Sequence, residues 1–268
     1  MLSLAPGRDR LTMNILISAY QTILYQPLFN ALVLLYEHLP GHDFGIAVIV
    51  LTVLIRLIFY PLMVQSIKSQ KVLSELQPKI QEIQQKYKGD KEKQARETMG
   101  LYQREKINPF GGCLPLLIQL PILIALYQVF WKGLQPEALA NLYSFVPYPG
   151  VINPTFLGII NLGQASLILA ILAGILQFFQ TKMITPKNPH QNKSGFGQAK
   201  KEDQMPQFSN MMQKQMLYFF PIFTVFILWK LPAAIALYWI ITALFSILQQ
   251  YLIFKPRTKT SFGTGQET

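Results

Sequence analysis

The sequence predicts an all-α membrane protein: a five-transmembrane-helix bundle with a cytoplasmic helical hairpin and an N-terminal outer interfacial helix. Three observations predict this class: the chain has long apolar stretches, it has few charged residues, and its basic residues gather in particular loops. Of the 268 residues, 51% are hydrophobic and 14% are charged, whereas about a quarter of a soluble domain is charged. Because the shortage arises in the apolar stretches, lipid is the expected solvent for much of the chain.

Five stretches are candidates for crossing a bilayer. A helix needs roughly 20 apolar residues to cross about 30 Å of hydrocarbon. The stretches that reach or approach this length are 44–64, 114–131, 157–180, 216–231 and 233–254. None of them contains Asp or Glu. Together they define an expected core domain, 44–254. The short connection between the last two predicts a tight turn at Lys230, Leu231 and Pro232.

The basic residues predict the orientation. The segments 65–113 and 181–215 and the short tail 255–268 hold nineteen Lys and Arg residues, against two, Lys132 and Lys230, on the other side. Positively charged loops stay in the cytoplasm. We therefore expect a protein of the cell membrane (plasma or inner) whose two large basic loops and C-terminus face the cytoplasm.

The N-terminal segment 1–43 has two interpretations. Residues 14–36 are apolar but interrupted by polar side chains and by Pro27, which favours an amphipathic helix lying along the outer interface. A sixth span is the competing interpretation. Met13 is an alternative start of the chain. We expect no lipoprotein anchor, because no Cys lies directly after the first apolar stretch.

Segment 65–107 is predicted to be a helical hairpin. Apolar residues recur every three or four positions, as in an amphipathic helix, at Val72, Leu73, Leu76, Ile80, Ile83 and Tyr87. A turn is expected at 88–91, and Pro78 should kink or break the first helix. The hairpin is either a solvated charged element or a docking arm for incoming chains, head groups or another membrane protein.

Arg56 is the one charge expected deep inside a span, since Lys230 lies at the outer end of 216–231. A guanidinium stays protonated, and an Arg at mid-membrane costs from about 3 to above 10 kcal/mol. No predicted span offers a carboxylate, so we expect Arg56 to face a hydrated cavity open to the cytoplasm. The competing interpretation makes it an interface residue bonded to helix carbonyls.

Four further residues are candidates for this cavity. Gln119 should lie at a depth close to that of Arg56, and Thr52 is one turn away on the same helix face. Tyr238 and Trp239 could contribute from the last span. An ordinary interhelical hydrogen bond is the alternative for Gln119, and packing or an interface belt is the alternative for the two aromatic residues.

Five motifs are informative: IRLIFYPL at 55–62, LQPKI at 76–80, INPFGGCLPLLIQLPI at 107–122, FFQTKM at 178–183 and LPAAIALYW at 231–239. Together they resemble the family of YidC-type membrane protein insertases, which includes the Oxa and Alb proteins. Arg56 matches the groove arginine of the family, and Gln77, Pro78 and Lys79 match its cytoplasmic hairpin. We do not expect the large extracytoplasmic domain of Gram-negative members between the first two apolar segments, because residues 37–43 alone separate them.

The resemblance implies a chaperone and insertase for newly made membrane proteins, acting alone or with the Sec translocon through a hydrated groove. Its expected partners are nascent membrane proteins, the Sec translocon and the lipid bilayer, with no DNA and no cofactor. Ribosome binding has weak support, because the tail holds three basic residues.

The sequence also bears on two other functional classes, an enzyme and a transporter. An enzyme is not expected, because the sequence has no Ser/His/Asp set, metal cluster or phosphate loop, and its single Cys113 excludes an internal disulfide. The alternative is a small anion or solute transporter or channel that binds its anion at Arg56. Transporters often contain two related halves, and no repeat is visible in this sequence.

Overall fold

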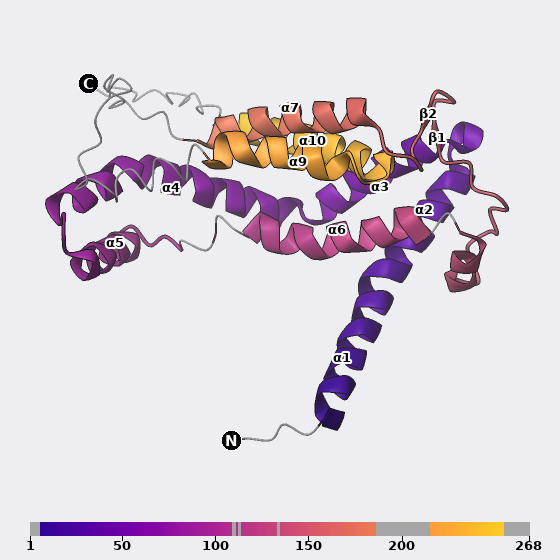
Figure 1. The fold of residues 1–268 in the computed structure, drawn as a ribbon, viewed down its shortest axis with the longest axis horizontal. Helices are drawn as coiled ribbons and strands as arrows, with labels where there is room; N and C mark the ends of the chain where they lie inside the picture. The colour runs from indigo at the N-terminus through magenta and orange to yellow at the C-terminus, as the bar shows by residue number, and fades with distance from the viewer. Residues whose placement is uncertain (1–5, 109–110, 112–113, 133–134, 186–214, 255–268) are drawn as a thin grey trace, which may run out of the picture.

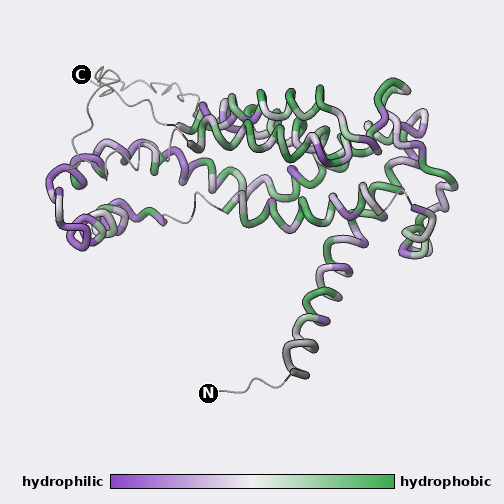
Figure 2. The backbone as a smooth tube through the Cα atoms, viewed as in Figure 1, coloured by the Kyte–Doolittle hydropathy of each residue, from purple (hydrophilic) through white to green (hydrophobic). Residues whose placement is uncertain are grey.

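The computed structural model describes residues 6–108, 111, 114–132, 135–185 and 215–254, which are mostly helical (Figure 1). The predicted tail 255–268 and most of the loop 181–215 lie outside the described residues. In the described part, apolar helices form a bundle, and a more hydrophilic pair of helices extends from one end of it (Figure 2).

The N-terminal segment is a nearly continuous helix made of α1 (Pro6–Tyr20), the π-helical turn η1 (Gln21–Tyr25) and α2 (Gln26–His38). Pro27 has no N–H to donate and disturbs a regular helix, and the π-helical turn directly precedes it. α1 projects from the bundle (Figure 1). α2 instead buries Phe29, Leu32 and Val33 in the core. A position of residues 14–36 along the outer surface stays a prediction.

After the short 3₁₀ turn η2 (Pro40–His42), the first predicted span is broken. α3 (Phe44–Ile58) ends before Phe59, α4 (Tyr60–Lys86) begins after it, and the two helices are bent by 68°. The prediction of one helix over 44–64 was therefore wrong at its end. Pro61 lies in the first turn of α4; it lacks the N–H that would continue the ladder of α3, and a first turn tolerates that loss.

α5 (Lys91–Arg104) follows α4 after a turn at Gly89, whose φ of +97° suits glycine. Leu76 and Ile80 of α4 form a small buried cluster with Leu101 of α5. α4 continues through Pro78, so this proline does not end the helix. The assignment of 65–107 as a cytoplasmic arm stays a prediction.

α6 (Leu114–Lys132) leads into the 3₁₀ turn η4 (Pro136–Asn141) and a loop with the antiparallel strands β1 (Thr155–Phe156) and β2 (Ile160–Asn161). α7 (Leu167–Ile184) begins only after this loop. The predicted helical start at 157 was therefore wrong: Gly158 occupies a hairpin turn at φ +68°, and the hydroxyl of Ser166 accepts the Leu169 N–H as the N-cap of α7.

The last described helices pack closely against α7. The π-helical turn η5 (Gln215–Phe219) precedes α9 (Phe220–Leu228), and α10 (Ala233–Phe254) follows a short turn where the sequence predicted one. A Cβ at Gly174 of α7 would lie 2.3 Å from Val225 Cγ2. Glycine therefore lets α7 and α9 approach closely, as small residues do between membrane helices.

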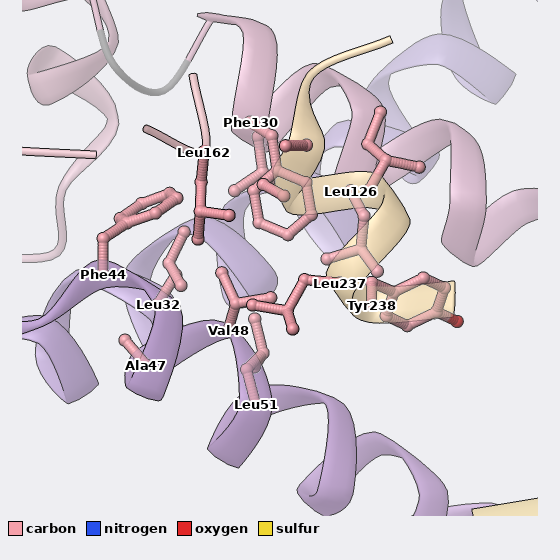
Figure 3. Packing of buried hydrophobic residues seen from close by; sticks show 14 of the residues in the cluster. Leu32, Phe44, Ala47, Val48, Leu51, Leu126, Phe130, Leu162, Leu237 and Tyr238 are labelled. Atoms are coloured by element: carbon pink, nitrogen blue, oxygen red, sulfur yellow. The ribbon is translucent and has the colours of Figure 1, made fainter. Parts of the chain in front are cut away.

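The main core joins residues from α2, α3, α6, α10 and the loop before α7 (Figure 3). Phe44 of α3, Phe130 of α6 and Leu162 of the loop are almost completely buried. The aromatic rings of Phe44 and Phe130 meet edge to face, with centroids 6.1 Å apart. This contact fixes the start of α3 against the end of α6.

In the described residues, α7 and α10 are long and apolar enough to cross a membrane, and the bent pair α3–α4 would make a third crossing. The apolar helices Leu117–Trp131 and Leu217–Leu228 are shorter. Length and composition thus support two or three crossings, and the five-span bundle stays a prediction.

Candidate functional site

Arg56 lies in the last turn of α3 and has 7% of its surface exposed. Its Nη2 donates to Oε1 of Gln119 on α6, at 3.4 Å. Because of the break at Phe59, Arg56 lies near the C-terminal end of α3, where the helix dipole is negative. The end of α3 therefore offers favourable electrostatics to a charge that has an amide, not a carboxylate, as its hydrogen-bond partner.

Gln119 connects this cation to α10. Its Oε1 accepts from Arg56, and its Nε2 donates to the phenolic oxygen of Tyr238 at 2.5 Å. The tyrosine is 1% exposed, and Figure 3 shows its ring at the edge of the core cluster. Three helices, α3, α6 and α10, thus contribute one side chain each to a polar network, Arg56–Gln119–Tyr238.

Thr52 and Trp239 form hydrogen bonds elsewhere. The hydroxyl of Thr52, 1% exposed, donates to the Val48 carbonyl one turn earlier at 2.6 Å. The indole Nε1 of Trp239 donates to Oε1 of Gln177 on α7 at 2.7 Å. Of the five predicted groove residues, the structure therefore joins three by hydrogen bonds. Trp239 follows Tyr238 in sequence, but successive helical side chains point in different directions.

The predicted hairpin residues lie on α4. Lys79 forms an ion pair with Glu105, just after α5, with Nζ and Oε1 2.7 Å apart. Pro78 is exposed and Gln77 is half-buried beside it. Both partners of the ion pair are accessible to solvent, so the pair contributes about 0–1 kcal/mol.

Sequence reasoning missed buried amides near the end of α10. Gln249 and Gln250 are 3% and 1% exposed, and within the described residues both side-chain polar atoms of Gln249 lack a hydrogen-bond partner. A buried polar group without a partner is costly. The sequence does contain a signal for these residues: two adjacent amide side chains interrupt an apolar span, and Ser246 lies one turn earlier.

A cavity of about 840 Å³ lies between α4, α7 and α10, and its lining is mostly apolar. Leu176, Phe179 and Leu244 contribute apolar surface. Lys71, Glu75 and Lys182 contribute charges of both signs. Arg56 is not among its lining residues. The hydrated cavity expected around Arg56 therefore stays a prediction, and this hollow is a separate feature of the bundle.

In the described ranges, no group of three His, Cys, Asp or Glu residues could hold a metal ion. The site is instead a buried cation with neutral polar partners, set among helices that expose large apolar side chains. Apolar exposure of this extent is typical of membrane helices, and internal polar groups of such helices mark functional sites. The fold and site thus define a polytopic helical membrane protein with a polar interior site.

Comparisons with known proteins identify the family. The family model for the 60Kd inner membrane protein matches residues 34–260. The membrane protein insertase YidC of Fusobacterium nucleatum is 34% identical over 213 residues, covering 80% of this chain and 87% of that protein. Those of Oceanobacillus iheyensis and Clostridium tetani are each 36% identical, covering 81% and 83% of this chain and 76% and 86% of the relatives. The chain belongs to this family, the YidC/Oxa family.

Proposed function

We infer that this chain is a membrane protein insertase: it receives newly made membrane proteins and releases them into the bilayer. The inference is supported by relatives that carry this name and match the chain over most of their own length. Insertion requires no covalent chemistry, so the role is not enzymatic. The insertase names leave the anion-transporter alternative without support.

The observation that carries the mechanism is the Arg56–Gln119–Tyr238 network, in which Arg56 and Tyr238 are buried and Gln119 is half-buried. During insertion, a polar and often acidic segment of the substrate has to cross the apolar layer. Arg56 would attract its carboxylates where the effective dielectric constant is low, so the Coulomb attraction exceeds that of the same contact in water. Gln119 and Tyr238 would hold the guanidinium in place and offer further polar contacts to the passing segment.

We propose that Arg56 is reached by water from the cytoplasm and that the bundle crosses the membrane five times. Buried polar side chains on α10, Ser246, Gln249 and Gln250, support a polar interior that continues toward the end of that helix. The charge distribution, nineteen basic residues against two, supports a cytoplasmic position of the α4–α5 end and of the C-terminus.

The cavity between α4, α7 and α10 supports a complementary role for apolar surface. Its volume, about 840 Å³, is within the range of ligand pockets, which measure about 300–1,000 Å³. We propose that it receives apolar side chains of the incoming transmembrane segment, while the hairpin residues Gln77, Pro78 and Lys79 contact the segment earlier. The Sec translocon is a proposed partner, and ribosome binding through the tail is a weaker proposal.

Reconstitution tests this function. The purified chain is placed in phospholipid vesicles, a single-span membrane protein is translated in their presence, and protease protection of its outer segment is measured. We expect protection that depends on the chain, and none in empty vesicles or for a soluble control protein. Equal protection in empty and loaded vesicles would contradict the insertase function.

A further inference from the structure

The loop between α6 and α7 has almost no charge. Residues 135–166 contain one charged residue, Glu137, whereas about a quarter of the residues in a soluble domain are charged. The loop lies at the end of the bundle opposite the α4–α5 pair, and Figure 2 shows hydrophobic residues at the tip between β1 and β2. Such a low content of charged residues is unusual for a loop that is fully exposed to water.

Five large apolar side chains of the loop point outward. Val151 is 94% exposed and Ile159 is 84% exposed, and three more large apolar side chains are 60–72% exposed: Phe145, Tyr148 and Leu157. Inward positions of the same loop, such as Val146 and Leu162, are buried in the core. Ser144 and Asn153 are polar residues at outward positions, but several large apolar side chains exposed on one loop mark a surface that contacts a membrane or another molecule.

Hydrogen bonds fix the loop to the bundle. The Leu157 N–H donates to Oδ2 of Asp43, whose Oδ1 accepts the Ile46 N–H at the start of α3. Farther along the loop, the Asn153 N–H donates to the Tyr36 hydroxyl at 3.1 Å. The exposed apolar side chains are therefore presented on a braced backbone.

The tip has an unfavourable backbone that this bracing maintains. Leu157 adopts φ +52°, a left-handed conformation that glycine, asparagine and aspartate adopt far more readily than leucine. Strained positions persist where the surroundings stabilise them, and they often have a function. Here, the strained conformation presents a leucine side chain that is 60% exposed.

We propose that the loop 142–160 is a membrane-interface element whose outward side chains, led by Val151 and Ile159, enter the head-group region of the bilayer. The chemistry points to lipid as the occupant. The loop connects the ends of two apolar helices, its outer surface is uncharged, and it combines aromatic with aliphatic side chains, a composition typical of interfacial anchors. The loop would hold this end of the bundle at a fixed depth.

The test uses fluorescent probes in the full chain. Cys113→Ser removes the native thiol, and Val151→Cys or Ile159→Cys is labelled with an environment-sensitive dye after reconstitution into phosphatidylglycerol and phosphatidylethanolamine vesicles. We expect strong quenching by lipids with a spin label near the glycerol backbone and weak quenching by aqueous iodide. Gln85→Cys on α4, an exposed position, is the matched control and should show the reverse, with a several-fold difference.

Two results would overturn the proposal. One is iodide quenching at 151 and 159 equal to that at 85, with no quenching by spin-labelled lipid. The other is shielding from iodide in native membranes but not in pure lipid vesicles, which would identify a protein partner as the occupant. Phe145→Cys gives a third probe if one of the two variants does not purify as a monodisperse protein, and insertion activity of each labelled chain confirms its fold.

Discussion

At the scale of residues, Arg56 shows how a cation can stay in an apolar bundle without a carboxylate partner. It lies in the last turn of α3, and its guanidinium donates to the amide of Gln119. The helix end supplies partial negative charge, and the neutral amide leaves the positive charge uncompensated. An approaching carboxylate would therefore meet a cation whose charge is not already neutralised by its hydrogen-bond partner.

Replacing Arg56 by Ala should reduce insertion of substrates with acidic outer segments about tenfold, which corresponds to ~1.4 kcal/mol. Arg56→Lys should retain more activity, because it keeps the charge although it lacks the guanidinium geometry. Protease protection in reconstituted vesicles measures both variants. A substrate with a neutral outer segment is the control and should be less affected; an equal loss for both substrates would argue against attraction by charge.

Tyr238→Phe should destabilise the bundle by about 0.5–1.5 kcal/mol, because the Nε2 of the half-buried Gln119 loses its acceptor. Denaturant or thermal unfolding in detergent measures the difference. Tyr251→Phe is the matched control, since Tyr251 lies on the same helix with 57% of its surface exposed. Equal stability of the two variants would show that the network contributes little to folding.

At the scale of elements, the α4–α5 hairpin is held by one amide as well as by its apolar cluster. Nε2 of Gln94 on α5 donates to the carbonyls of Gln84 and Tyr87, at 3.2 and 2.8 Å. The Gln84 carbonyl lies in the last turn of α4, where helical partners are missing, and the Tyr87 carbonyl, just after α4, also accepts the Asp90 N–H. Gln94 thus closes the end of α4 from the neighbouring helix.

Gln94→Ala should lower the local stability of the hairpin by about 1 kcal/mol, because the Gln84 carbonyl loses this donor and the Tyr87 carbonyl keeps only the Asp90 N–H. Amide hydrogen exchange should speed up in the last turns of α4 and in α5, with little change in α7 and α10. Gln85→Ala, at an exposed position of α4, should leave exchange unchanged. Faster exchange across the whole bundle would contradict a local role.

The sequence predicted helices better than it predicted where they end. Hydropathy identified 44–64 and 157–180 as apolar, but it does not distinguish a continuous helix from one broken at Phe59 or from a β-hairpin followed by α7. Both differences arise from local backbone chemistry, at Pro61 and Gly158. These residues were visible in the sequence, and their effect was outweighed by the apolar composition around them.

The part of the candidate site that could be predicted is the depth of each residue in the membrane, because depth follows from position along a helix. Gln119 was expected at nearly the level of Arg56, and the two side chains are hydrogen-bonded. The sequence does not determine how each helix is rotated about its axis, which is why Tyr238 joins the network while Trp239 bonds to Gln177. Those partners depend on tertiary packing.

At the scale of the whole molecule, the distribution of charge predicts the orientation. In a Cys113→Ser background, Gln85→Cys should react with a membrane-impermeant maleimide only in inverted vesicles, because the basic α4–α5 end should be cytoplasmic. Ala140→Cys, on η4 at the other end of the bundle, should react in intact cells. The reverse pattern would invert the proposed topology.

The central claim is that substrates pass beside the Arg56–Gln119–Tyr238 network, and crosslinking tests it most directly. A photoreactive amino acid is placed at Gln119 or, as a control, at Ile168, which is 79% exposed on α7, and cells synthesise a stalled, partly inserted membrane protein. We predict that position 119 crosslinks to the polar segment that precedes the substrate's transmembrane helix, and that position 168 does not. Efficient insertion without any crosslink from position 119 would contradict the account.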